Sequence, residues 1–529
     1  MKIFQENFKP TFTLRHAFIA ALYFVLSIFG ILHHEMWLDE MHHFLLARDS
    51  ASIVNLAYNA RYDGHPLLWD LLLYFLTRFT HDPFYMQLLN ILISLAAVII
   101  FLRNAPFTEL FKFLFVFSYF MLYEYNIISR NYAISALFLF ISCSLIFAEK
   151  RNYTAIFISL LLLCCTHLFS LFCAVSLFIV VSVFYFQEKK DSASRVKLVI
   201  WILFFAVSVA LILWSIFPPP DHFLHEYDTD PYFSFKRIGK GFSIFFKGFY
   251  PLPDFLKYNT WNTNLAVDYA KNLGVVLSVL CLIIPFILFQ RKPLSLFVFY
   301  SSSIIIAVFI WWSPMVASER YFGFIFLLLV VSLWLFYYLP EKKFLLSEKF
   351  HERLNKFNHR FENPFVYSVL IIQVISAVIA YTADIIKPFS EGKEVANYLT
   401  ENNLADKTIA VSNQSAGPPI SAYLDKKLFY PETNQFGTFC KWNTNPFVID
   451  KKELISRVEK ITSDTLILIV NDSTLKTSSD LSLPVYSDDS IKIFYVTKFD
   501  KALVRAENYW LYEVVRNENE QQKPKREGM

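Results

Sequence analysis

The stretch FIAALYFVLSIFGILHHEMWLDEMHHF, residues 18–44, joins an apolar run to a dense group of titratable side chains. The apolar part ends near residue 32 and is long enough to cross the hydrocarbon layer of a membrane. Four histidines and two adjacent carboxylates, Asp39 and Glu40, follow within residues 33–44. Because burying bare charges costs on the order of several kcal/mol, this group predicts that the first membrane crossing ends here, at a boundary with water.

The rest of the chain is apolar for most of its length. Of its 529 residues, 55% are hydrophobic and 18% are charged, whereas soluble domains carry about 25% charged residues. Apolar runs recur down to residue 386, which predicts a polytopic α-helical membrane protein with about eleven transmembrane helices and additional juxtamembrane helices. The expected spans are 16–32, 84–102, 108–123, 131–148, 153–168, 170–186, 197–216, 272–290, 294–312, 320–339 and 364–386. The net charge of +4 is small, and no nucleic-acid partner is expected.

The segment PLLWDLLLYFLTRF, residues 66–79, decides the expected topology. It is short and carries Asp70 and Arg78. If this segment does not cross the membrane, the basic loops all lie on one side. The positive-inside rule assigns that side to the cytoplasm. We therefore expect a juxtamembrane helix here, a cytoplasmic N-terminus and an extracytoplasmic C-terminal region in a multi-pass protein of the bacterial inner membrane.

The C-terminal region has a different composition. Three of its segments have the pattern of short strands and two that of helices. They are TIAVS (408–412), TLILIV (465–470), IKIFYV (491–496), KEVANYLTEN (393–402) and PPISAYLDK (418–426). The sequence therefore predicts a transmembrane domain over residues 1–386 and an extracytoplasmic α/β domain over residues 387–529.

The polar residues after the first span have alternative interpretations. Asp39 and Glu40 are either functional or solvated residues of the loop that ends the span. In a helix, Asp39, His42 and His43 would share one face, which is compatible with a metal site, although the zinc-protease signature is absent. His65 precedes a short helix that begins with proline, and it is either a substrate contact or only a helix-start residue.

Two arginines stand at the edge of expected spans on the side opposite to the basic loops. They are Arg130 and Arg320, and each has a tyrosine nearby, Tyr132 and Tyr321. An arginine placed against the positive-inside trend indicates an anionic partner. The partner of Arg130 is either a phosphate or the neighbouring Glu124, and the repetition of the pattern at Arg320 favours a lipid-linked phosphate.

These motifs together resemble the GT-C glycosyltransferases, a group that includes the protein O-mannosyltransferases and the lipid A aminoarabinose transferases. The shared features are an acidic residue or Asp-Glu pair after the first span, a juxtamembrane helix opened by His-Pro, and an Arg-x-Tyr motif in a later outer loop, to which the Arg-Tyr of a further loop is related. Their carriers are WLDEMHHFLLARD (37–49), GHPLLWDLLLYFL (64–76), SRNYAISALFLF (129–140) and SERYFGF (318–324). The resemblance covers about residues 15–340, and Leu67 departs from it because the family has a second proline there.

The resemblance implies transfer of a sugar from a polyprenyl-phosphate donor to an acceptor on the outer face of the membrane. Asp39 matches the loop aspartate of the family and would be the base of an inverting reaction, with Glu40 orienting it or the acceptor. The expected substrate-binding residues are His65, Glu124, Arg130, Tyr132, Arg320 and Tyr321. The reaction is metal-dependent or metal-independent, so the sequence leaves a divalent metal cofactor undetermined, together with the donor sugar and the acceptor.

A transporter or lipid flippase without transfer chemistry is the alternative. Such proteins place charged residues inside their spans and contain helices broken by glycine or proline. Here the expected spans are nearly free of charge, and the whole chain has 11 glycines. The acidic residues gather at one membrane face instead, which favours an enzyme that works at the interface.

Overall fold

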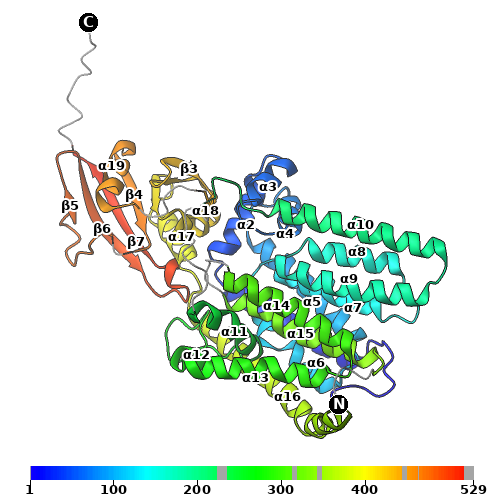
Figure 1. The fold of residues 1–529 in the computed structure, drawn as a ribbon. Helices are drawn as coiled ribbons and strands as arrows, with labels where there is room; N and C mark the ends of the chain where they lie inside the picture. Colours follow the sequence, from blue (N-terminus) through cyan, green and yellow to red (C-terminus); the bar gives the residue numbers. More distant parts are fainter. Residues whose placement is uncertain are drawn as a thin grey trace.

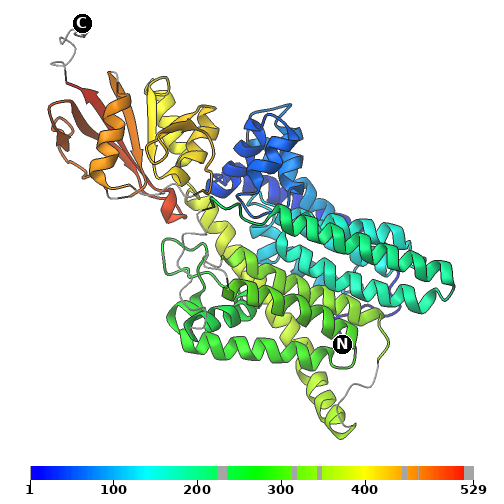
Figure 2. The ribbon, with the colours of Figure 1, turned by 45° about the horizontal axis from the view of Figure 1, so that its top comes forward.

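The structure is a computed structural model that describes residues 2–222, 235–312, 318–341, 348–443, 449–462, 464–472 and 474–517. A helical bundle extends to Ile386, and a sheet domain packs against one end of it (Figure 1 and Figure 2). The elements of the bundle are α1 (Leu14–His33), α2 (Leu38–Asp49), α3 (Ile53–Ala60), α4 (Leu68–Leu76), α5 (Phe84–Asn104), α6 (Glu109–Val116), the π-helix η1 (Tyr119–Glu124), α7 (Tyr132–Ile146), α8 (Tyr153–Cys164), α9 (Leu168–Glu188), α10 (Ser192–Ser215), α11 (Phe235–Phe249), α12 (Leu265–Tyr269), α13 (Lys271–Phe289), α14 (Pro293–Trp312), α15 (Glu319–Tyr338) and α16 (Glu348–Ile386).

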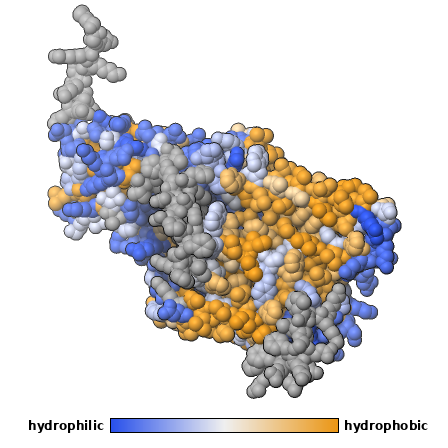
Figure 3. Space-filling model, in the orientation of Figure 1, coloured by the Kyte–Doolittle hydropathy of each residue, from blue (hydrophilic) through white to orange (hydrophobic). Residues whose placement is uncertain are grey.

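Eight helices in the described part of the chain are long and apolar enough to cross a membrane. They are α1, α5, α9, α10, α13, α14, α15 and the part of α16 from Asn363 onward. The surface is consistent with this, because α10 exposes apolar side chains such as Leu203 and Phe204, each 60% accessible. Figure 3 shows an apolar band over the bundle between hydrophilic surfaces on the sheet domain and at the opposite end. The chain is therefore a polytopic α-helical membrane protein.

The other three expected spans are shorter or interrupted, so the predicted number of eleven is not confirmed. Helices α7 and α8 have 15 and 12 residues. The expected span 108–123 divides at Phe117 into α6 and η1. In η1 the N–H of Tyr125 donates to the carbonyl oxygen of Phe120 at 2.9 Å, five residues back. A π-turn accommodates one additional residue, which rotates the residues after it relative to an α-helix and often marks a functional site.

The segment 66–79 forms α4, which has nine residues. At 1.5 Å per residue it is about 14 Å long, less than half of the roughly 30 Å hydrocarbon layer. It is thus a short helix that cannot cross, in agreement with the expected juxtamembrane helix.

The sheet domain has seven strands in the order β3-β2-β1-β4-β7-β6-β5. β1 lies between β2 and β4 and is parallel to both, while β7 is antiparallel to β4. The elements are α17 (Gly392–Glu401), β1 (Thr408–Ser412), α18 (Gly417–Leu424), β2 (Leu428–Tyr430), β3 (Gln435–Gly437), α19 (Lys451–Ile461), β4 (Thr465–Val470), β5 (Tyr486–Ser487), β6 (Ile491–Phe499) and β7 (Tyr509–Arg516). The three strands expected from the sequence are present as β1, β4 and β6.

Strand β4 shows why strand sequences in this domain are continuously apolar. Alternate residues of β4 contribute to two separate cores: Leu466 and Leu468 pack with α19, and Ile467 and Ile469 pack with α17 and α18. A strand covered by helices on both faces has no polar side, so its sequence does not alternate.

The sheet domain contacts the bundle through helix α18, which packs on α2. Ala422 of α18 lies in a buried cluster with Met36 and Met41. The N–H of Met36 also donates to the hydroxyl of Tyr423 at 3.2 Å. Helix α2, which carries the acidic pair, is therefore held between the two parts of the molecule.

Candidate functional site

Several loops that are distant in sequence meet at the end of the bundle that faces the sheet domain. The guanidinium Nη1 of Arg130 donates to the backbone carbonyl of Asp39 at 2.7 Å. The ring of His65 lies 5.2 Å from that of His167, measured between centroids. We call the region formed by Asp39, His65, Arg130, His167 and Arg320 the mouth.

Asp39 lies between two arginines in the mouth. Its Oδ2 atom is 2.6 Å from Nη2 of Arg320 and 3.2 Å from Nη1 of Arg130. The carboxylate is 19% exposed, whereas both arginine side chains are nearly buried. The structure thus brings together the acid and the two arginines that the sequence singled out. One carboxylate and two guanidinium groups give this set a net charge of +1.

The arginines control the acidity of Asp39. Burial alone favours the neutral acid, but the guanidinium groups of Arg320 and Arg130 hold the pKa of Asp39 below its ordinary value. The carboxylate is therefore ionised, and it is a weak base while both arginines face it. An anion bound to the arginines would offset their charge and raise the basicity of Asp39.

The two arginines also have donors that remain unused. Nε and Nη1 of Arg320 and Nε of Arg130 are buried and have no hydrogen-bond partner among the described residues. The guanidinium of Arg320 lies over the rings of Trp37 and Trp261, at 5.2 and 5.9 Å from their centroids. Permanently charged groups with free donors, held against aromatic faces, suit an anion with several acceptor oxygens, such as a phosphate. Neither tryptophan stands out in the sequence, because each is an uncharged residue outside the helices.

Glu40 is oriented differently from Asp39 and is fully buried. Its Oε1 accepts from the backbone N–H of Ser129 at 2.6 Å, and its Oε2 lies 3.0 Å from Nε2 of His34 and accepts from the N–H of Trp37. Both oxygens are therefore engaged within the protein. Glu40 thus joins α2 to the loop that carries Arg130. Its expected role in orienting Asp39 or the acceptor stays a prediction.

His34 connects Glu40 to the last transmembrane helix. Its Nδ1 lies 2.8 Å from Oδ2 of Asp384 in α16, so the imidazole bridges two carboxylates. Burial opposes its protonation, but Asp384 and Glu40 together raise the pKa of His34 to about 10. The imidazolium therefore neutralises part of the charge of two buried acids.

This bridge predicts a pH-dependent stability. Because the pKa of His34 is raised on folding, its contribution is complete below about pH 6.5, the unfolded value, and disappears as the pH rises through about 10. The thermal unfolding midpoint of the detergent-solubilised protein should therefore fall from pH 7 to pH 10. Replacing His34 with glutamine (H34Q) should remove this dependence and destabilise the protein at pH 7 by about 3–5 kcal/mol, the usual cost of breaking a buried pair. H33Q is the matched control because His33 is exposed, and parallel curves for H34Q and wild type would contradict the assignment.

His167 is a buried imidazole and His65 a half-buried one, and both are neutral. Burial, with His167 and Arg130 nearby, lowers the pKa of His65 well below its ordinary value, and Nε2 of His65 lies 3.3 Å from Nη2 of Arg130. Burial and the two arginines lower the pKa of His167 to about 3. His167 also caps α9 by accepting from the N–H of Phe169, and its Nε2 has no partner among the described residues. His167 was not among the expected site residues, although its position as a lone titratable group between two apolar spans was a usable signal.

The remaining expected substrate-binding residues surround the mouth. The ring of Tyr132 stacks on Tyr125 at 4.9 Å, and the Tyr132 hydroxyl is buried without a partner in the described structure. The Tyr321 ring lies 6.3 Å from that of His167. Glu124 accepts from the hydroxyl of Tyr119 and is not the ion-pair partner of Arg130, whose carboxylate partner is Asp39.

The histidines of α2 do not form a metal site with Asp39. Nε2 of His42 lies 2.8 Å from Oδ1 of Asp63, and Nδ1 of His43 lies 2.5 Å from Oδ1 of Asp70. Each imidazole is thus paired with its own carboxylate. Within the described residues no group of three or more His, Cys, Asp or Glu side chains has an arrangement that could hold a metal ion.

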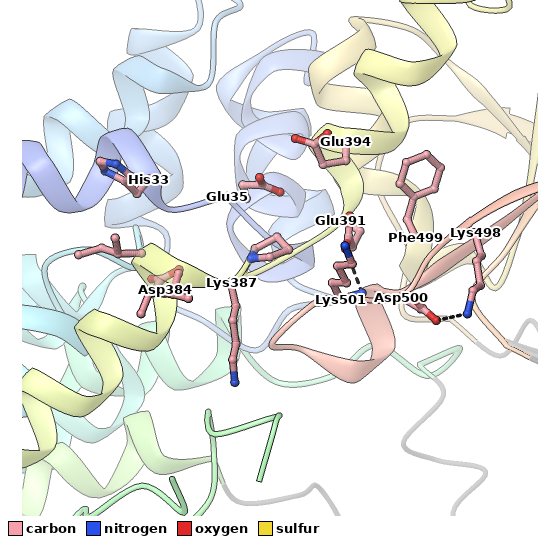
Figure 4. A pocket seen from close by; sticks show the side chains of 13 residues that line it. His33, Glu35, Asp384, Lys387, Glu391, Glu394, Lys498, Phe499, Asp500 and Lys501 are labelled. Carbon is pink, nitrogen blue, oxygen red and sulfur yellow. Dashed lines mark hydrogen bonds and ion pairs between the residues drawn. The ribbon is translucent and has the colours of Figure 1, made fainter. Parts of the chain in front are cut away.

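A pocket of about 420 Å³ lies beside the mouth, between the end of α1, the end of α16 and the segment that links β6 to β7. Figure 4 shows the carboxylates of Glu35 and Glu394 on facing sides of this pocket, with Glu391 below them. Burial and repulsion from Glu394 raise the pKa of Glu35 to about 8. The lining of the pocket thus combines carboxylates with the ammonium groups of Lys387, Lys498 and Lys501.

Comparison with solved structures gives a structural relative, whereas the two sequence comparisons give none. No family model and no curated protein matches the chain. The chain is similar to a solved structure described as the crystal structure of ArnT from Cupriavidus metallidurans bound to undecaprenyl phosphate, with 10% sequence identity and a TM-score of 0.46. The alignment covers 94% of this chain and 97% of that chain.

Proposed function

We propose that the protein is a membrane glycosyltransferase of the GT-C type that transfers a sugar from a polyprenyl-phosphate donor to an acceptor. The observation that carries this proposal is the position of Asp39 between Arg130 and Arg320. A base and two phosphate-binding groups are the requirements of a transfer in which a phosphate leaves. The helices around the mouth are apolar and therefore suit the lipid chain of such a donor. Helix α10, for example, exposes many apolar side chains.

The proposed reaction is a direct displacement at the anomeric carbon. Asp39 removes the proton from the acceptor hydroxyl, the acceptor oxygen forms a bond to the anomeric carbon, and the bond from that carbon to the phosphate oxygen breaks. The leaving group is the polyprenyl phosphate anion, whose charge Arg130 and Arg320 stabilise. Attack on the side opposite to the phosphate inverts the configuration of the sugar.

The charges in the mouth imply that the donor binds before Asp39 becomes an effective base. Before the donor binds, both arginines face Asp39 and keep its basicity low. When the donor phosphate takes the unused donors of the arginines, its negative charge offsets theirs and makes Asp39 a better base. The proton acceptor is thus strengthened by the same phosphate that later leaves.

The test is a transfer assay with the purified protein in lipid vesicles. Radiolabelled polyprenyl-phosphate sugars are supplied with a membrane extract as the source of acceptors, and release of sugar-free polyprenyl phosphate is measured. Release that requires the protein supports the proposal. Movement of the labelled lipid between leaflets with no release of its sugar would show a flippase instead.

We also propose that the mouth and the sheet domain lie on the extracytoplasmic side. The support is the distribution of basic loops at the opposite end of the bundle, where Arg151 pairs with Glu188 and Arg291 with Glu341. A cysteine introduced at the exposed Lys476 (K476C) should react with a membrane-impermeant maleimide in spheroplasts. A cysteine at the exposed Lys150 (K150C) should react only after permeabilisation, and the reverse pattern would invert the orientation.

A further inference from the structure

At the start of helix α2, Glu40 of the same helix accepts from the N–H of Trp37 but leaves the N–H of Leu38 to another partner. The N-cap residue is Trp37, whose indole can donate but cannot accept a hydrogen bond. The first N–H of the helix, that of Leu38, is instead bound by Oε1 of Glu507 at 3.2 Å, from a position 469 residues later in the chain. The sheet domain therefore supplies the cap of the helix whose second residue is Asp39.

Glu507 is fixed from several sides. It is 2% exposed and precedes β7. Its Oε2 accepts from the hydroxyl of Ser390 at 2.8 Å and from that of Tyr509 at 2.9 Å. Its backbone carbonyl accepts from the N–H of Glu391 at 3.2 Å. No ion pair to Glu507 occurs among the residues that the structure describes, so this carboxylate acts as a hydrogen-bond acceptor and not as half of a salt bridge.

The cap lies one residue from the proposed base. The N-terminus of α2 is attached to the sheet domain through Leu38 and to the Arg130 loop through Glu40. The carboxylate of Asp39 contacts both arginines only if this end of the helix keeps its position. A shift of about 1 Å at a reacting group can cost about 10²-fold in rate.

We propose that Glu507 is a positioning residue for the transfer reaction: by capping α2 from the sheet domain, it holds Asp39 in contact with Arg130 and Arg320. This inference rests on the proposed function for its effect on rate. The capping contact itself is independent of what the mouth catalyses. The sheet domain is thus part of the catalytic geometry and more than a cover or an acceptor-binding module.

The first test compares two substitutions of Glu507. Alanine (E507A) removes the acceptor from Leu38 and should lower kcat about 10–100-fold, with KM for the donor changed less than about twofold, because the arginines remain. Glutamine (E507Q) keeps a carbonyl oxygen for Leu38. Its amide can donate to the hydroxyl of Tyr509, whose own hydrogen is free to bond the carbonyl of Ala416, 3.2 Å away. E507Q should therefore restore kcat to within about threefold of wild type, and E507Q as slow as E507A would overturn the capping role.

The second test measures how well the amides at the start of α2 are protected, by hydrogen exchange of the detergent-solubilised protein. E507A should increase amide exchange in a peptide covering residues 36–44 about 10-fold, whereas E507Q should not. The matched control is E513A, because Glu513 lies on β7, the strand that follows Glu507, but is half-exposed and pairs with Lys407 at 2.9 Å. Unchanged exchange in E507A, or equal increases in E507A and E513A, would overturn the inference. Absence of transfer by the wild-type protein would overturn the proposed function instead, and the two failures are therefore distinguishable.

Discussion

Replacing Asp39 with asparagine (D39N) should lower sugar transfer by about 10²–10⁴-fold, the range that a positioned general base contributes. Asparagine is nearly isosteric and keeps a carbonyl oxygen for Arg320 and Arg130. It cannot take the proton of the acceptor hydroxyl, so the loss should appear in kcat more than in donor affinity. The measurement is the initial rate of polyprenyl phosphate release at equal amounts of protein in vesicles.

The control for D39N is D49N on the same helix. Asp49 is 27% exposed and pairs with Arg48 at 2.8 Å, so it has a similar environment but lies at the far end of α2. D49N should transfer at close to the wild-type rate. A D39N protein with full activity would remove Asp39 from the mechanism and leave the two arginines as a binding site only.

Arg320 should be the second most sensitive position. Replacing it with glutamine (R320Q) should reduce kcat/KM by about 10²–10³-fold, as removal of one strong donor from a developing anion does. Lysine (R320K) should restore little, because a single ammonium cannot present the planar fork of donors that a phosphate accepts. Arg130 remains in both variants, so donor binding should weaken without disappearing.

The matched control for Arg320 is R151Q, which removes another arginine that is ion-paired with a carboxylate. Arg151 pairs with Glu188 at the end of the bundle away from the mouth. R151Q should bind a labelled polyprenyl phosphate with the wild-type affinity, measured at equilibrium. Equal losses in R151Q and R320Q would indicate a general loss of stability, and an unimpaired R320Q would mean that the phosphate binds elsewhere.

Much of the fold follows from local properties of the sequence. The eight long spans agree with expected apolar runs, and β1 and β4 have the expected bounds, 408–412 and 465–470. These elements are predictable because length and hydropathy decide them within a short window. The break of the segment 108–123 into α6 and η1 was not predictable in this way, since both halves are apolar and the π-turn leaves no mark in hydropathy.

The charged residues of the site could be predicted from the sequence, but the role of each could not. Asp39 and Arg320 stand out in an apolar chain, and the structure joins them. Glu40 stands out equally, but its carboxylate is used inside the protein by Ser129 and His34. Adjacent residues of a helix point in directions about 100° apart, so the sequence could mark the acidic pair but not separate the roles of its two members.

From the amino-acid sequence alone it follows that this chain crosses a membrane many times and carries its acids and unusual arginines at the ends of spans. Hydropathy and charge are properties of short segments, so no knowledge of packing was needed. The contacts of Asp39 with both arginines, and the capping of its helix by Glu507, become visible only in the folded molecule. Those contacts depend on how several helices and a separate sheet domain pack together, because no local pattern relates groups that far apart in the chain.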